Sequence, residues 1–213
     1  MSMNNSKKVS LAAAATVAFA GTAGAARKKA VAELMAGIRD DNAKVRTEAW
    51  LSAGEAGAAA VKPLARVMSN KELEVARAAK RGLWKIVRHA GRPGAGNKKR
   101  AVVGRLVELL GDEQPVPVRR EVLWMLSEIG DRKSIKPIAA LLSNGELRED
   151  ARMVLQRIPS KGAVAALRAG LKAAPEDFKL NIAQSLRQRG VKVRGLPCVK
   201  LVPTKKTSVK PLK

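Results

Sequence analysis

Apolar side chains recur with a helical period in five segments that share one pattern, at 45–49, 75–79, 118–122, 147–151 and 178–182. In each segment an apolar residue is followed by a second apolar residue after four positions and by Ala or Leu after eight. This spacing places all three side chains on one face of a helix. The pattern therefore predicts five amphipathic helices.

A shorter apolar-periodic stretch precedes each of these segments, at 30–38, 58–68, 101–110, 134–142 and 163–171. The five repeats start at 45, 75, 118, 147 and 178, in steps of 30, 43, 29 and 31, so one insertion near 91–99 explains the long step. Each repeat reads as a helical hairpin, and stacked hairpins bury apolar sides that one hairpin alone leaves exposed. The sequence predicts an all-α fold, an α-solenoid of about five hairpins over residues 26–191.

The repeats resemble the HEAT-repeat family, whose fold is a HEAT/armadillo-like superhelix. Lys62-Pro63-Leu64 and Lys136-Pro137-Ile138 match the proline-bearing first helix, and Val-Arg starts at 45 and 118 match the second. Residues 151–168 are also similar to repeats of exported bacterial HEAT proteins, whereas Ala76, Phe178 and Lys179 depart from the pattern. The resemblance implies a binding scaffold whose second helices line a concave surface.

The first 25 residues have the order of a secretory signal peptide. Lys7 and Lys8 precede a weakly apolar stretch at 9–20, and the small residues Ala23 and Ala25 follow it. This order predicts export to the periplasm or the medium with cleavage after Ala25, and the apolar stretch is too short for a permanent membrane anchor. The alternative is an Ala-rich first helix of a cytoplasmic protein.

Charge and rare residues narrow the function classes. The net charge of +24 implies a partner or surroundings rich in anions. Cys198 is the only cysteine and His89 is the only histidine. An internal disulfide and a zinc site of Cys and His ligands are therefore excluded, and we predict neither a metal nor a cofactor. No nucleophile with a base, no paired carboxylates and no phosphate loop stand out, and we therefore expect no enzyme activity.

One basic stretch is the candidate binding surface. No acid occurs between Glu74 and Glu108, so we expect no local ion pair to neutralise the stretch, and we expect the insertion to add a mobile cationic loop. The alternative is a solvated face that serves solubility. The candidate residues are Arg77, Lys80, Arg81, Lys85, Arg88, Arg92, Lys98, Lys99, Arg100 and Arg105.

Other basic residues have a structural interpretation. Arg46, Arg119 and Arg148 are expected to join adjacent repeats by pairing with acids, as basic residues of the resembled family do. Residues 192–213 contain basic residues and prolines but no acid, and they predict a flexible tail. Alternatively, the apolar residues near Cys198 dock on the last repeat.

Two functions from different classes fit these observations. The first is a non-enzymatic exported scaffold that holds an acidic protein or an envelope polyanion. The alternative is a cytoplasmic protein that binds nucleic acid without sequence specificity. A HEAT-like DNA glycosylase would need tryptophans and a carboxylate in one cleft, for which Trp124 and Glu128 are the nearest candidates. The three tryptophans lie at different phases of their repeats, so we expect no single stacking row and assign each to packing in the core or in a groove.

Overall fold

The computed structural model describes residues 24–198, and within this range every regular element is a helix. The all-α prediction is confirmed. The predicted leader at 1–25 lies outside the described residues except for its last two, which belong to a helix at 24–38. Residues 199–213 of the predicted tail also lie outside.

The helices lie where the apolar period predicts them. The helix at 24–38 is followed by α2 (Ala43–Ser52), α3 (Ala58–Val67), α4 (Leu73–Ala90), α5 (Gly96–Val107), α6 (Val116–Ile129), α7 (Ile135–Ala140), α8 (Arg148–Arg157), α9 (Lys161–Ala173) and α10 (Glu176–Gln188). Short 3-10 turns follow three of them, namely η1 (Ala53–Ala56), η2 (Glu108–Leu110) and η3 (Leu141–Ser143).

Three of the turns inside the hairpins contain an Asn whose side chain makes the same hydrogen bond to the backbone. Asn42, Asn70 and Asn144 each accept a hydrogen bond from the backbone N–H two residues later, at 2.8, 2.8 and 3.0 Å. Asn favours such turns because its short side chain imitates a backbone carbonyl. The three turns therefore lead into α2, α4 and α8 in a similar way.

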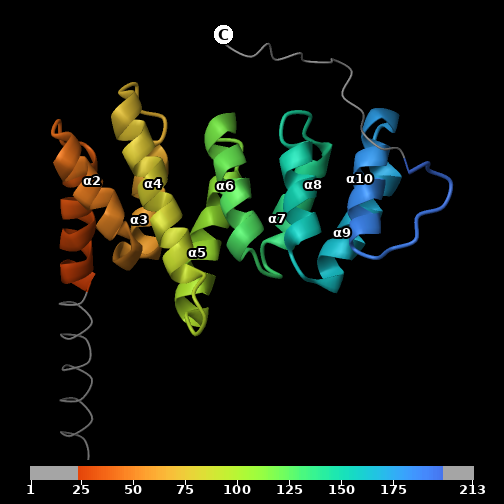
Figure 1. Cartoon of the computed structure of the whole chain (residues 1–213), viewed down its shortest axis with the longest axis horizontal. Coiled ribbons are helices and arrows are strands. Elements are labelled where there is room, and N and C mark those ends of the chain that lie inside the picture. The colour runs from red at the N-terminus through yellow and green to blue at the C-terminus, as the bar shows by residue number, and fades with distance from the viewer. Residues whose placement is uncertain (1–23, 199–213) are drawn as a thin grey trace, which may run out of the picture.

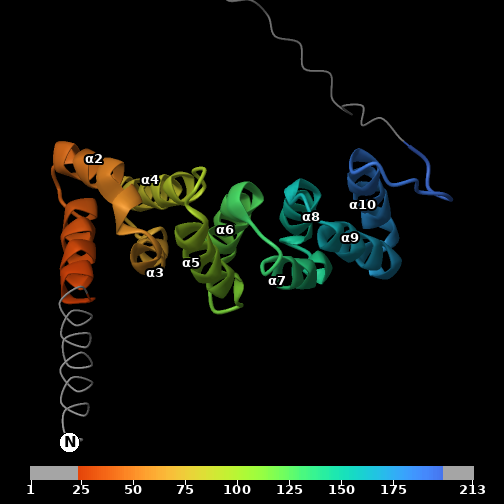
Figure 2. The ribbon, with the colours of Figure 1, turned by 90° about the horizontal axis from the view of Figure 1, so that it is seen from below.

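The helices form two rows. In Figure 2, α2, α4, α6, α8 and α10 occupy one row, and α3, α5, α7 and α9 occupy the other. Each helix of the first row packs against the next one in that row, and α3 and α4, α5 and α6, and α7 and α8 pack across the rows. Helices close in sequence are therefore neighbours in space, and they follow one another from α2 to α10 across the molecule (Figure 1).

The core lies between the two rows and consists mainly of aliphatic side chains. The residues eight positions after the repeat starts are at most 1% exposed: Ala53, Leu83, Leu126, Leu155 and Leu186. Phe178 is the one buried aromatic residue in the described chain. The predicted helix faces are thus the faces that pack.

The expectation of a mobile cationic loop at the insertion is wrong. Residues 91–95 form the turn, and Gly94 adopts φ +78° there. Helix α5 begins at Gly96, so Lys98 and Lys99 are in its first turn. The apolar residues Val102, Val103 and Leu106 are buried and hold this helix in the second row.

The described end of the predicted tail contacts the last helix. The guanidinium of Arg187 donates to the carbonyl oxygens of Leu196 at 2.5 Å and of Pro197 at 3.3 Å. Residues 196–197 are therefore docked on α10. No helix within residues 24–198 combines the length and the apolar character needed to cross a bilayer.

The packing between rows predicts a large stability difference between two leucines. Leu126 is fully buried on α6 and Leu73 is 59% exposed at the start of α4. Leu126→Ala should lower the free energy of unfolding by about 2–5 kcal/mol, because it leaves a cavity in the core. Leu73→Ala should change it by about 0.5 kcal/mol or less. Urea unfolding followed by circular dichroism measures both, and equal effects would contradict the assigned core.

Candidate anion-binding surface

The outer face of α4 carries five cations above a buried apolar face. Helical spacings of three and four residues bring the cations into one stripe, while Ala79, Leu83 and Ile86 face the core. Trp50 of α2 and Trp84 of α4 lie beside them. We call the groove lined by Trp50, Arg77, Lys80, Arg81, Trp84, Lys85 and Arg88 the cationic groove.

The two tryptophan rings hold three of these cations. The guanidinium carbon of Arg81 is 5.6 Å, and Nζ of Lys85 is 5.7 Å, from the centroid of the Trp50 ring. The guanidinium carbon of Arg88 is 5.4 Å from the centroid of Trp84. These are cation–π distances, which attract the cation to the ring without cancelling its charge.

The remaining two cations of the groove are paired with acids. Arg77 pairs with Glu74 at 2.7 Å, and Lys80 pairs with Glu121 of α6 at 2.6 Å. Glu121 also accepts the indole N–H of Trp84 at 2.6 Å, and its side chain is 18% exposed. Within residues 24–198, by contrast, Arg81, Lys85 and Arg88 form no ion pair. They are the uncompensated charges of the groove.

The expectation that no local ion pair neutralises the basic stretch is therefore wrong in part. Glu74 and Glu108 flank the stretch and reach back onto Arg77 and Arg105 by helical i,i+3 spacing. Glu121 belongs to α6, the next helix of the row. Its ion pair with Lys80 could not be predicted because the two residues are far apart in the sequence.

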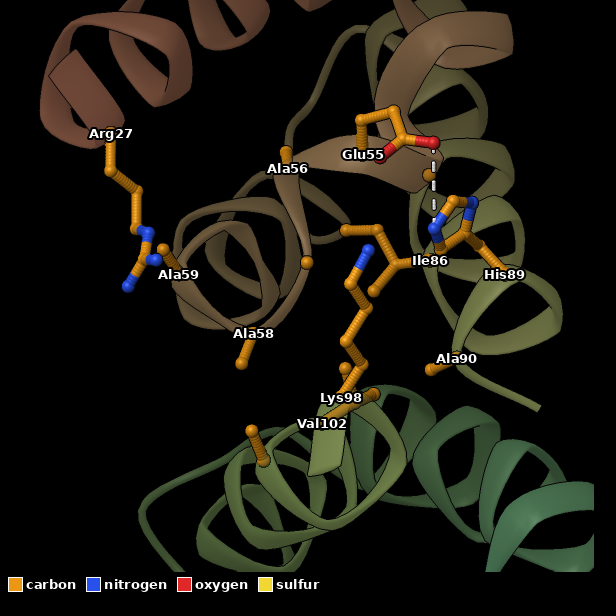
Figure 3. A pocket seen from close by; sticks show the side chains of 13 residues that line it. Arg27, Glu55, Ala56, Ala58, Ala59, Ile86, His89, Ala90, Lys98 and Val102 are labelled. Carbon is orange, nitrogen blue, oxygen red and sulfur yellow. Dashed lines mark ion pairs between the residues drawn. The ribbon is translucent and has the colours of Figure 1, made fainter. Parts of the chain in front are cut away.

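The ten candidate residues do not form one surface. Five line the cationic groove, and the other five lie on the turn after α4 and on α5, in the other row of helices. Arg92 donates to the backbone carbonyl of His89 at 3.0 Å, Arg100 contacts Asn97, and Arg105 pairs with Glu108 at 3.0 Å. Lys98 lines a separate pocket, shown in Figure 3. The stretch is thus divided by the fold.

The cationic groove is the most positive part of its row. Counting Lys and Arg against Asp and Glu, α4 carries +4, whereas α6 and α10 carry 0 and α8 carries +1. Four of the five cations of α6 and α8 form ion pairs, among them Arg120 with Asp150 at 3.0 Å and Arg152 with Glu149 at 2.7 Å. An anion that approaches this row meets unpaired positive charge at α4.

The expected pairing of other arginines between repeats holds for Arg148. It reaches Asp177 of the next repeat at 2.6 Å. Arg119 is buried and pairs with Asp112 at 2.8 Å in the turn of its own repeat, and Arg46 donates to the carbonyls of Asp40 and Asp41 at 2.7 Å. These two arginines fix the turn before their helix instead of joining repeats.

Trp50 and Trp84 pack in a groove, as one of the expected roles had it, but they were not among the candidate binding residues, and Glu121 was missed altogether. The tryptophans lie five, nine and six positions after their repeat starts, which at about 100° per residue confines them to one arc of about 100°. Trp50 and Trp84 line the same groove but contact different cations, and Trp124 does not line it, so the three do not form one stacking row. Counting helical phase from each repeat start would have shown that Trp50 and Trp84 face the same side.

Trp124 has a different environment. It is 49% exposed, and its indole N–H donates to Asp150 at 3.0 Å. Glu128 is also exposed. An extruded base needs an enclosing pocket, which two exposed side chains do not provide. In the described part of the chain, no three His, Cys, Asp or Glu side chains gather as they would around a metal ion.

Comparison with known proteins does not assign a family. No family model and no curated protein matches the chain. Among solved structures, a crystal structure of an engineered protein is similar to this chain at 20% identity with a TM-score of 0.38, over 74% of this chain and 78% of that one. A similarity of this size supports no conclusion about function.

The contact between α4 and α6 predicts a role for Glu121 in stability. Glu121→Ala leaves the half-buried indole N–H of Trp84 without its acceptor and should lower the free energy of unfolding by about 1 kcal/mol. Glu128→Ala, on the same helix, removes an exposed acid that makes no ion pair in the described chain. It should change stability by only a few tenths of a kcal/mol. Urea titration distinguishes the two, and equal losses would refute the role of the contact.

Glu108 gives a pH-dependent link between α3 and η2. The hydrogen bond from Lys62, at 2.6 Å, and then that from Arg105 hold the pKa of the Glu108 carboxyl below its usual value. A lowered folded-state pKa stabilises the fold above the unfolded-state pKa, and the effect is lost as pH falls through the folded pKa. Glu108→Gln should therefore destabilise the protein at neutral pH and be equal to the wild type in acid. Denaturant midpoints at both pH values test this, and a difference that persists in acid would contradict it.

Proposed function

We propose that this chain is a HEAT-like α-solenoid that acts as a non-catalytic binding scaffold. Its support is the two rows of helices, in which neighbours in sequence pack against each other, together with the recurring Asn turns. In such an array each hairpin is stabilised mainly by the next, and one row remains available for a partner.

The scaffold binds an acidic partner through the cationic groove. The observation that carries this is the group Arg81, Lys85 and Arg88, which lies against tryptophan rings and is not compensated by acids of the described chain. The rings restrict the long side chains before binding, so less rotamer entropy is lost when an anion arrives. Arg81 and Arg88 can also bind carboxylates in two-point hydrogen bonds. An exported acidic protein or an envelope polyanion fits this chemistry.

Nucleic acid is the second candidate, because α5 also carries +4 and packs against α4. A hairpin with this charge suits the phosphate backbone in a cytoplasmic protein. The groove suits stacked bases less well, since cations already lie over the faces of Trp50 and Trp84. In this candidate function, the protein contacts the phosphates of the nucleic acid and does not recognise its bases.

Charge reversal tests the groove with both ligand classes. We expect Arg81→Glu, Lys85→Glu and Arg88→Glu together to weaken binding of polyglutamate and of a DNA duplex. The slope of log K against log salt for the duplex should fall by about three, one for each lost phosphate contact. Fluorescence anisotropy of a labelled ligand at several salt concentrations measures both.

The matched control reverses three exposed cations of α9, Lys161→Glu, Arg168→Glu and Lys172→Glu. It changes the net charge by the same amount in the other row of helices. If both triple variants lose affinity equally, binding follows net charge and the groove assignment fails. The nucleic-acid candidate would be favoured if the wild type does not bind polyglutamate and the groove variant loses affinity for DNA.

A further inference from the structure

A pocket on the other side of α4 is separate from the cationic groove. The helix at 24–38, η1, α3, α4 and α5 surround it, and its cavity volume is about 190 Å³. This volume is below the range of about 300–1,000 Å³ that small-molecule sites usually have, so the pocket accepts only a small ligand. Figure 3 shows alanines of η1, α3 and α4, with Ile86 and Val102, around the cavity.

Two cations from different helices border this apolar pocket, on different sides of α3. Lys98 extends from α5 into the space beside Ile86, and Arg27 reaches down from the first helix beside Ala59 (Figure 3). Neither forms an ion pair within residues 24–198. Because Lys98 is the third residue of α5, the helix itself fixes the base of this side chain at the pocket floor.

The acid and the imidazole of the pocket are held at its far wall. His89 Nε2 is 2.7 Å from the guanidinium of Arg92 and 3.5 Å from Glu55. A guanidinium has no hydrogen-bond acceptor, so Arg92 is the donor in the shorter contact. A Cβ on Gly54 would lie 3.1 Å from the ring, so the glycine allows the imidazole to pack closely on η1.

We propose that this pocket binds a small monoanion with a short aliphatic body, such as a short-chain carboxylate. Lys98 forms no ion pair within residues 24–198, so its charge is available to one carboxylate. The alanine-rich wall with Ile86 and Val102 takes the aliphatic part, and Lys98 binds the carboxylate. None of its lining residues lines the cationic groove, so the two sites are separate.

Hexanoate is the probe, with hexylamine as the ligand of opposite charge and equal length. Methyl resonances of Ile86 and Val102 in the full chain report binding in the pocket. We expect hexanoate to shift both in a saturable way and hexylamine not to shift them. Lys98→Met should weaken hexanoate binding about tenfold or more, because a charge-assisted hydrogen bond is lost.

Two further variants keep the test decisive. Lys44→Met removes one charge from the exposed start of α2 and should leave the affinity unchanged. Ala101→Phe fills the pocket without changing charge and should abolish the methyl shifts, with helicity by circular dichroism confirming the fold. Binding that survives both Lys98→Met and Ala101→Phe, or that hexylamine matches, would overturn the proposal. Polyglutamate binding is measured separately, so a failure of hexanoate to bind the pocket does not affect the test of the cationic groove.

Discussion

Burial of aliphatic side chains between consecutive hairpins is the constraint on which the rest of this structure depends. A two-row arrangement provides a core only where each hairpin covers the next, and the fully buried Leu83, Leu126 and Leu155 mark that contact in successive repeats. Their alignment also fixes the rotation of each helix about its axis. Because α4 must turn Leu83 and Ile86 inward, its cations are turned outward together. The cationic groove is thus a consequence of core packing.

The same packing brings the tryptophans to the cations. Trp50 belongs to α2 and reaches Arg81 and Lys85 only because α2 packs against α4. A cation–π contact at an exposed site contributes about 0.5–1 kcal/mol, similar to a surface ion pair. The two kinds of contact therefore stabilise the helix pair about equally. They differ in the charge that remains, because a ring leaves the cation able to bind an anion and a carboxylate does not.

Local periodicity sufficed to predict the helices, whereas contacts between repeats escaped it. The apolar spacing at 118–122 fixes the buried face of α6 without any tertiary information, and the structure agrees. That Glu121 would pair with Lys80, 41 residues earlier, depends on which helices become neighbours and how they are rotated. The insertion was misjudged for a related reason. Its glycines and lysines indicate a loop, but Val102 and Leu106 further on gain enough burial to start α5 at Gly96.

Comparing equivalent positions explains why free charge concentrates on α4. The third residue after the repeat start is Glu121 on α6 and Asp150 on α8, and each accepts hydrogen bonds from the preceding helix of the row. At the same position α4 has Ala78, which is buried and offers no acceptor to α2. The polar ladder that joins the other helices of the row is therefore interrupted between α2 and α4, and Trp50 replaces it. Since a ring takes the place of an acid at this step, the groove keeps positive charge that the same row neutralises at α6 and α8.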